Sequence, residues 1–304
     1  MNLNRRETLG LALGAAAGLI TRPFSALAQD PRPETLIVHV TDTHLREDVP
    51  AERWTRQCME MVARLQPDLV IHGGDLIDAG RNQTVATCDH RWEMWQRCIR
   101  GLDLNLLYTL GNHDLPAMLG DARDPQAPLA GKRFFAARMG EGRTYRSIRL
   151  PNAHVVALDT VDLRPDGSYQ GLIDEAQLKW LDEDLARVPP GMPIVLSAHI
   201  PVFSIIAQYE HGPLRPVPDW QLVTNPIAFR WVVDMYYVKV VLQGHTHSVD
   251  EAGYRGIRYV TSGAISGNWW QGNRFEVHPP GFGVVALQAD GAVWTYRPYG
   301  WRPE

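Results

Sequence analysis

The strongest chemical signal in this 304-residue sequence is a pair of histidines, His245 and His247, separated by one residue. The pair follows Gly244 and an apolar run, residues 238–243, that is typical of a buried strand. It is therefore expected at the C-terminal end of a strand, where open α/β sheets place their ligand sites. Neutral imidazole binds Zn, Fe, Mn or Cu. Two rings with a turn between them can face different metal ions, whereas a His-x-His pair on its own can equally be a solvated turn.

Four further groups of metal-ligand residue types follow apolar segments in the same way. They are Asp42-Thr43-His44, Gly74-Asp75, Gly111-Asn112-His113-Asp114 and the single His199. The preceding segments are predicted strands over residues 35–40, 68–72, 105–110 and 193–198. The glycines let the backbone turn sharply and approach a ligand closely. Asp75 can offer two oxygens, which is the property needed to bridge two metal ions.

The elements that must position these groups alternate along the chain. Helical patterns occupy residues 52–65, 90–100, 174–185 and 226–235. Together with the strands they predict a parallel sheet with right-handed crossovers. A hairpin is expected over residues 144–158, and residues 115–142 and 203–224 are interpreted as long loops, the first of them a candidate lid. Short strands near residues 256–261, 282–287 and 292–296 are expected to form an antiparallel edge on a second sheet.

Taken in chain order, the five groups resemble the sequence blocks of the calcineurin-like metallophosphoesterase superfamily. The predicted helix over residues 174–185, preceded by Tyr169-Gln170-Gly171 and followed by the His199 strand, is similar to that of the bacterial cyclic-nucleotide phosphodiesterase branch. The similarity to the superfamily extends over about residues 36–300, and every block contains its expected ligand. It implies an α/β fold, specifically a four-layer α/β/β/α sandwich of two mixed sheets flanked by helices. The dinuclear metal site of such a fold lies at the C-terminal ends of the strands.

The resemblance also implies two divalent metal ions, Mn, Fe or Zn, with ligands distributed over all five groups. The first ion would be held by Asp42, His44, Asp75 and His247. The second would be held by Asp75, Asn112, His199 and His245, so that Asp75 bridges the pair. Such pairs clamp an in-line displacement at phosphorus and lower the pKa of a shared water, so that hydroxide can attack at neutral pH. Asn112, as a neutral ligand, keeps the centre from becoming too negative for an anionic substrate.

Two further positions would carry catalytic roles by the same resemblance. His113 would lie close to the leaving-group oxygen as a general acid, and Asp114 would hold the His113 ring through its other nitrogen. Asp78 stands where relatives with a purple iron–tyrosinate centre have a tyrosine, so that ligand and colour are not expected.

The implied enzyme is a hydrolase of phosphoric ester bonds. A phosphodiesterase acting on a small nucleotide or glycerophospho-diester is the first interpretation. A phosphomonoesterase and, from another class of protein, a metal-bound noncatalytic binding module are the alternatives.

The first 28 residues resemble an export signal. Arg5 and Arg6 precede an apolar, Gly/Ala-rich stretch, and a small-x-small cleavage site follows it. Adjacent arginines are typical of the twin-arginine pathway, but Thr8 replaces the large apolar residue usual there, which leaves the general secretory route open. An uncleaved anchor is the other alternative. We predict a signal peptide over residues 1–28, one metallophosphoesterase domain over residues 29–304, and a periplasmic or otherwise exported protein.

Composition limits the partners. The formal net charge is -4 and no basic run could follow a phosphate backbone, so a nucleic-acid polymer is not expected and a small-molecule phosphoester is. No stable membrane span is expected in the mature form, and the oligomeric state is left open. The odd number of cysteines leaves at least one thiol unpaired in an exported protein. Cys58 fits a buried apolar position, and a bridge between Cys88 and Cys98 stays open.

Two tryptophans and three histidines outside these groups could also lie near the site. Trp269 and Trp270 lie on a glycine-flanked loop, where they could cover the site or pack against the edge of the sandwich. His39, His72 and His154 lie in strand patterns, and we expect them to pack in the core or on the surface instead of binding metal.

Overall fold

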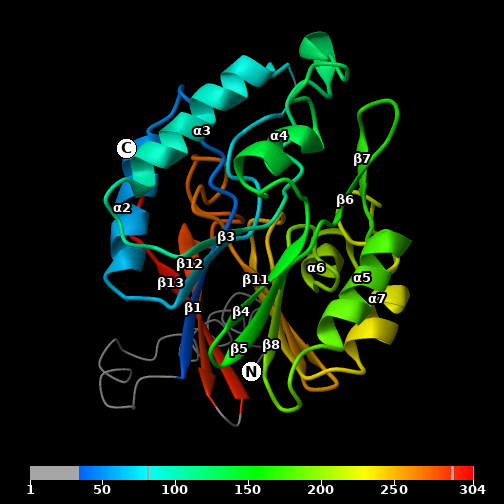
Figure 1. Cartoon of the computed structure of the whole chain (residues 1–304). Coiled ribbons are helices and arrows are strands. Elements are labelled where there is room, and N and C mark those ends of the chain that lie inside the picture. Colours follow the sequence, from blue (N-terminus) through cyan, green and yellow to red (C-terminus); the bar gives the residue numbers. More distant parts are fainter. Residues whose placement is uncertain (1–33, 81, 289–290, 304) are drawn as a thin grey trace, which may run out of the picture. The chain divides into compact units, whose positions relative to one another are not determined.

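Two mixed β-sheets face each other in the part of the chain that the computed structural model describes, residues 34–80, 82–288 and 291–303 (Figure 1). The first sheet has the order β13-β12-β1-β2-β3. Its strands are β1 (Thr35–Val40), β2 (Leu69–His72), β3 (Leu106–Tyr108), β12 (Gly281–Gln288) and β13 (Gly291–Pro298). β1, β2 and β3 are parallel, and β12 and β13 continue the sheet from β1 in antiparallel pairing.

The second sheet has the order β10-β11-β9-β8-β5-β4. Its strands are β4 (Arg146–Leu150), β5 (Ala153–Ala157), β8 (Ile194–Ala198), β9 (Val238–Gln243), β10 (Val249–Tyr254) and β11 (Ile257–Ser262). The four central strands β5, β8, β9 and β11 run parallel, and antiparallel hairpins close both edges. Ile37 and Ile71 of the first sheet share one buried cluster with Val195 and Val240 of the second, so the two sheets pack face to face.

Helices cover the outer faces of both sheets. α2 (Ala51–Ala63) and α3 (Val85–Ile99) flank the first sheet, and α5 (Glu175–Leu185) and α7 (Pro226–Val233) flank the second (Figure 1). Both helices α2 and α5 bury one face. Met59 of α2 and Leu181 of α5 lie on these buried faces and belong to a second large apolar cluster. The predicted four-layer α/β/β/α sandwich is therefore confirmed, because each sheet is buried on both sides.

Local capping explains where two of these helices begin. The Thr84 hydroxyl accepts a hydrogen bond from the backbone N–H of Thr87 at the start of α3 (3.1 Å). The Asp174 carboxylate accepts one from the N–H of Gln177 at the start of α5 (2.7 Å). Both side chains satisfy amide groups that have no partner within their own helix. α5 thus begins at the position that the sequence predicts.

The segments predicted as loops contain further structure. α4 (Lys132–Arg138) interrupts the first of them and buries Phe134 and Phe135, and α6 (Ile206–His211) lies in the second. After β5, β6 (Val161–Leu163) and β7 (Tyr169–Gly171) form a small two-stranded sheet of their own. The expected antiparallel edge on the second sheet is wrong for β12 and β13, which pair with β1 in the first sheet.

The three cysteines are buried and free. Cys88 and Cys98 both lie in α3, where ten residues of helix separate their Cα atoms by about 15 Å. A disulfide cannot span that distance, so the bridge left open by the sequence is excluded. Within the described ranges, every helix falls short of the length and apolarity needed to cross a bilayer. The predicted signal peptide lies outside the described residues.

Candidate metal centre

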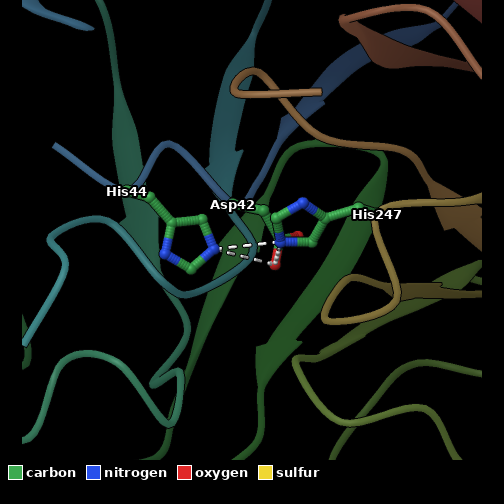
Figure 2. Close-up of side chains that lie close together, drawn as sticks. All are labelled: Asp42, His44 and His247. Carbon is green, nitrogen blue, oxygen red and sulfur yellow. Dashed lines mark hydrogen bonds and ion pairs between the residues drawn. The ribbon is translucent and has the colours of Figure 1, made fainter. Parts of the chain in front are cut away.

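Loops at the C-terminal ends of the parallel strands bring all seven predicted ligands together from the two sheets. Asp42, His44 and His247 form one cluster, and Figure 2 shows their polar atoms converging. His44 Nε2 lies 3.0 Å from His247 Nε2, and Asp42 Oδ1 lies 3.4 Å from His247 Nε2. A second cluster is formed by Asp75, His199 and His245, and Asn112 Oδ1 lies 3.2 Å from His199 Nε2 beside it.

Asp75 lies between the two clusters. Its Oδ2 is 3.1 Å from His199 Nε2 in the second cluster and 3.6 Å from His44 Nε2 in the first. Its Oδ1 accepts a hydrogen bond from the backbone N–H of His113 (2.7 Å), which holds the carboxylate in this orientation. A single carboxylate oxygen between two imidazole nitrogens is the arrangement that a bridging ligand requires.

Backbone carbonyl groups set the orientation of two imidazole rings. His199 Nδ1–H donates to the carbonyl oxygen of Gly73 (2.9 Å), and His247 Nδ1–H donates to that of Gly267 (2.6 Å). With Nδ1 engaged in this way, each ring has its Nε2 directed toward a carboxylate of its cluster. Such a hydrogen bond from the distal ring nitrogen is the usual support of a metal-binding histidine.

The donor set fits divalent metal ions. His245 Nε2 is buried and has no hydrogen-bond partner within the described chain. Burial lowers the pKa of His44, and it lowers the pKa of His245 to about 3, so both rings are neutral and can act as ligands. Neutral imidazoles, two carboxylates and one amide oxygen suit Zn, Mn or Fe. A buried nitrogen without a hydrogen-bond partner is costly in the protein alone, and a bound cation would remove that cost.

The loops that carry these side chains have an unusual backbone conformation. Five of the seven predicted ligands have positive φ angles between 44° and 70°: Asp42, His44, Asp75, His245 and His247. Non-glycine residues adopt this left-handed conformation rarely, and it costs free energy unless the surrounding structure enforces it. Its repetition around one point marks the strand ends as a functional site.

Glycine is required at Gly111 for the loops to approach each other. A Cβ atom there would lie 2.1 Å from the backbone N of Asp75 and 2.2 Å from its Oδ1. Gly74 has a φ angle of +103°, and a Cβ there would lie 2.5 Å from His199 Nδ1. The glycines next to the ligands therefore supply close contact and backbone freedom, as the sequence predicts.

His113 lies beside the first cluster, with its ring edge-on to that of His44 at a centroid distance of 4.9 Å. Its Nδ1 is 3.0 Å from Asp78 Oδ1, so Asp78 is the carboxylate that orients this ring. Burial by itself would lower the pKa of His113, but the carboxylates of Asp75 and Asp78 outweigh it and raise that pKa. A ring with a raised pKa retains a proton that Nε2 can deliver.

The predicted role of Asp114 is wrong. Its carboxylate accepts hydrogen bonds from four backbone N–H groups instead of orienting His113: those of Asp75 (3.0 Å), Leu76 (2.9 Å), Ile77 (3.3 Å) and Gly111 (2.9 Å). Asp114 is fully buried and ties the loop after β2 to the loop after β3. The turn after β3 sends the adjacent side chains of His113 and Asp114 in different directions, which their order in the sequence does not reveal.

Trp269 and Trp270 have different roles: one covers the site and the other packs in the core. The ring of Trp269 lies 3.9 Å from that of His44 and 5.0 Å from that of His247, centroid to centroid, so it covers the first cluster. Trp270 is buried, and its indole N–H donates to the carbonyl groups of Thr43 and His44. Trp270 therefore packs, whereas Trp269 belongs to the site.

Three histidines outside the ligand set pack in the core, and two aromatic residues approach the site. His39, His72 and His154 are buried and bonded to Ser262, Thr43 and Asp184, which confirms that they pack. Tyr169 and Trp220 approach His245 on the side of the second cluster, although no sequence pattern singled them out for the site. Long-range packing alone brings them there.

Fold and site together define a phosphoester hydrolase of the dinuclear metal type. A family model described as calcineurin-like phosphoesterase matches residues 35–249. Because this match covers well over half of the chain, the protein belongs to the calcineurin-like phosphoesterase family and is a hydrolase acting on phosphoric ester bonds.

Two curated relatives are similar to most of the chain. A cAMP/cGMP dual specificity phosphodiesterase of Mycobacterium tuberculosis is 26% identical over 251 residues, covering 76% of this chain and 67% of the relative. A probable cyclic nucleotide phosphodiesterase of Rhodococcus erythropolis is 25% identical over 246 residues, covering 76% of this chain and 70% of the relative.

Solved structures share the fold at lower identity. A dimetal phosphatase from Danio rerio superposes with a TM-score of 0.63 at 16% identity, covering 88% of this chain and 97% of the other. A purple acid phosphatase from yellow lupin gives 0.57 at 16% identity, covering 87% of this chain and 51% of the other. At this identity the likeness establishes the fold alone.

Proposed function

We propose that this protein is a dinuclear metal-dependent phosphodiesterase acting on a small phosphodiester, either a nucleotide or a glycerophospho-diester. The observation that carries the proposal is the position of Asp75 Oδ2, within 3.6 Å of a histidine nitrogen in each of the two clusters. The preference for a diester draws support from the two relatives named as cyclic nucleotide phosphodiesterases.

The seven strand-end side chains are the ligands in this proposal. Asp42, His44, Asp75 and His247 hold the first ion. Asp75, Asn112, His199 and His245 hold the second. The ions would be Mn, Fe or Zn, and the bound pair would supply an activated water and offset the charge on the phosphoryl oxygens. With aspartate at position 78, the set has no tyrosinate donor to colour the centre.

His113 acts as the general acid. The hydrogen bond with Asp78 engages Nδ1 and leaves Nε2 for the leaving-group oxygen. The same carboxylate favours the protonated ring, as does Asp75. A positioned proton donor of this kind contributes about 10²- to 10⁴-fold to the rate. Trp269, packed over His44 and His247, excludes water from one side of the centre.

Export to the periplasm is part of the proposal. It is supported by the adjacent Arg5 and Arg6 ahead of the apolar stretch and the small-residue cleavage site. Export in the folded state would let the protein take up its metal ions before it crosses the membrane.

The test compares a diester with a monoester. Metal-stripped protein is reloaded with Mn, Fe or Zn and assayed with bis-p-nitrophenyl phosphate and p-nitrophenyl phosphate. Metal-dependent hydrolysis mainly of the diester is expected. Hydrolysis mainly of the monoester would make the protein a phosphomonoesterase. No hydrolysis of either, with two ions bound per chain, would contradict the proposed activity and favour a binding module.

A further inference from the structure

Aromatic rings lie on both sides of the metal centre, but they differ in exposure. On the side of the first cluster, Trp269 is packed against three histidine rings: His44 at 3.9 Å, His247 at 5.0 Å and His113 at 4.9 Å. Consecutive positive φ angles at Trp269 (54°) and Trp270 (63°) turn this ring onto the ligands. Since Trp269 is packed over ligands, this side offers little room for the organic part of a substrate.

The side of the second cluster is different. Tyr169 and Trp220 approach the ring of His245 edge-on, with centroid distances of 6.3 Å and 6.1 Å and interplanar angles of 83° and 73°. Trp220 is 47% exposed, although it lies next to a predicted metal ligand. A large apolar ring that faces water beside a phosphoester site offers a stacking surface to the substrate.

Backbone pairing holds these two rings on one support. Tyr169 belongs to β7, and Trp220 lies in a turn of the following insertion. The N–H of Gly171 donates to the carbonyl of Asp219 (2.7 Å), and the N–H of Thr224 donates to the carbonyl of Gly171 (2.7 Å). The guanidinium of Arg164 joins the same two segments through Gln170 (2.9 Å) and the carboxylate of Asp219. The exposed ring is therefore carried by a braced turn.

We infer that Tyr169 and Trp220 form a subsite for a planar ring of the substrate, with the phosphoryl group placed over the metal centre beside His245. The inference depends on the proposed phosphodiesterase function and narrows it. A nucleobase has a flat π-face that stacks on tryptophan or tyrosine, whereas glycerol has none. The subsite therefore selects nucleotides over glycerophospho-diesters, and Tyr169 and Trp220 are specificity-determining residues.

The test separates the ring from the phosphate. Isothermal titration of the Mn- or Zn-loaded protein compares AMP with ribose 5-phosphate, in which a hydroxyl group replaces the nucleobase. Stacking on an aromatic side chain should make AMP bind about ten-fold more tightly. In Trp220→Leu the ratio of the two dissociation constants should fall toward one, and Trp220→Phe should recover part of it. Trp231, an exposed tryptophan on α7, provides the matched control Trp231→Leu, which should keep the ratio of the unmodified protein.

Two results would overturn the subsite. One is equal affinity of the unmodified protein for AMP and ribose 5-phosphate. The other is an unchanged ratio in both Trp220→Leu and Tyr169→Leu with two metal ions bound per chain. Hydrolysis of bis-p-nitrophenyl phosphate is measured on the same preparations. If the diester is cleaved while AMP binds no more tightly than ribose 5-phosphate, only the proposed subsite is contradicted. If the diester is not cleaved, the proposed function itself fails.

Discussion

Replacing Gly111 with alanine should disrupt the metal centre, although this residue contributes no ligand. The new Cβ would lie 2.1 Å from the backbone N of Asp75. Real Cβ atoms essentially never approach another atom more closely than 3.0 Å. Neither partner can yield easily, because Asp75 N–H is bonded to Asp114 (3.0 Å) and Asp75 Oδ1 to the N–H of His113 (2.7 Å). The two loops must therefore separate by about 1 Å, several times the tolerance of roughly 0.2 Å in a metal–ligand distance.

Overpacking of this kind costs about 1–3 kcal/mol. For a domain of this size, Tm of the metal-free protein should fall by roughly 2–12 °C. The same displacement moves Asp75 away from its place between the clusters, so fewer than two metal ions per chain should remain. Differential scanning calorimetry measures the first quantity, and inductively coupled plasma mass spectrometry of the dialysed protein measures the second.

Gly253→Ala provides the matched control. Gly253 lies in the edge strand β10, and a Cβ there would meet no atom within 4 Å. Its Tm and metal content should stay close to those of the unmodified protein. If Gly111→Ala binds two ions per chain and has the same Tm as Gly253→Ala, Gly111 is not needed for the close approach of the two loops.

Four other perturbations test the general acid, the bracing carboxylate, the metal ions and the export signal separately. His113→Asn should lower kcat by about 10²- to 10⁴-fold with metal content unchanged, and Asp78→Asn should give a smaller loss; unaltered kcat in both would remove this pair from the mechanism. Asp114→Asn should lower the free energy of unfolding in urea by about 1–3 kcal/mol, because buried N–H groups lose an acceptor, and equal stability would contradict its bracing role. Chelation should abolish hydrolysis and lower Tm, and returning the metal should restore both; a Tm indifferent to metal would mean that the folded state binds none. Arg5→Lys with Arg6→Lys should retain the protein in the cytoplasm, whereas continued export would indicate the general secretory route.

The ligand groups could be predicted from the sequence because each is a local pattern. A buried strand followed by a glycine and a donor places that donor at the strand end, as His245 after β9 illustrates. The partner of His113 is not local. Asp78 reaches it from 35 positions away, because the loop after β2 folds beside the loop after β3. Asp114 is adjacent to His113 in sequence and serves a different purpose, so proximity along the chain was misleading.

Strand pairing shows the same limit. The strand segments β12 and β13 were predicted from their composition, but no local feature distinguishes pairing with β1 from pairing in the other sheet. α4 escaped prediction because its seven residues are too few to show a periodic apolar stripe, although Phe134 and Phe135 are buried. Trp220 carries no sequence signal at all, since its position beside His245 depends on how the insertion packs.

The strained backbone of the ligands explains why the site is a property of the assembled sheets and not of any one loop. Each left-handed residue costs on the order of 1–3 kcal/mol, so an isolated loop would relax to a common conformation. The neighbouring loops prevent this by hydrogen bonding to each other. Asp42 N–H donates to Gly74 and His44 N–H to Asp75, both at 3.0 Å, and Gly244 N–H donates to His199 at 3.1 Å. The first two bonds join loops within the first sheet, the third joins loops within the second, and the N–H of His245 donates across the sheets to the Asp42 carboxylate (3.1 Å). The ligands can therefore reach their positions only after the strands have paired. The positions of the ligands are therefore fixed largely by hydrogen bonds within the protein, which is the preorganisation that stabilisation of charge at a phosphoryl group requires.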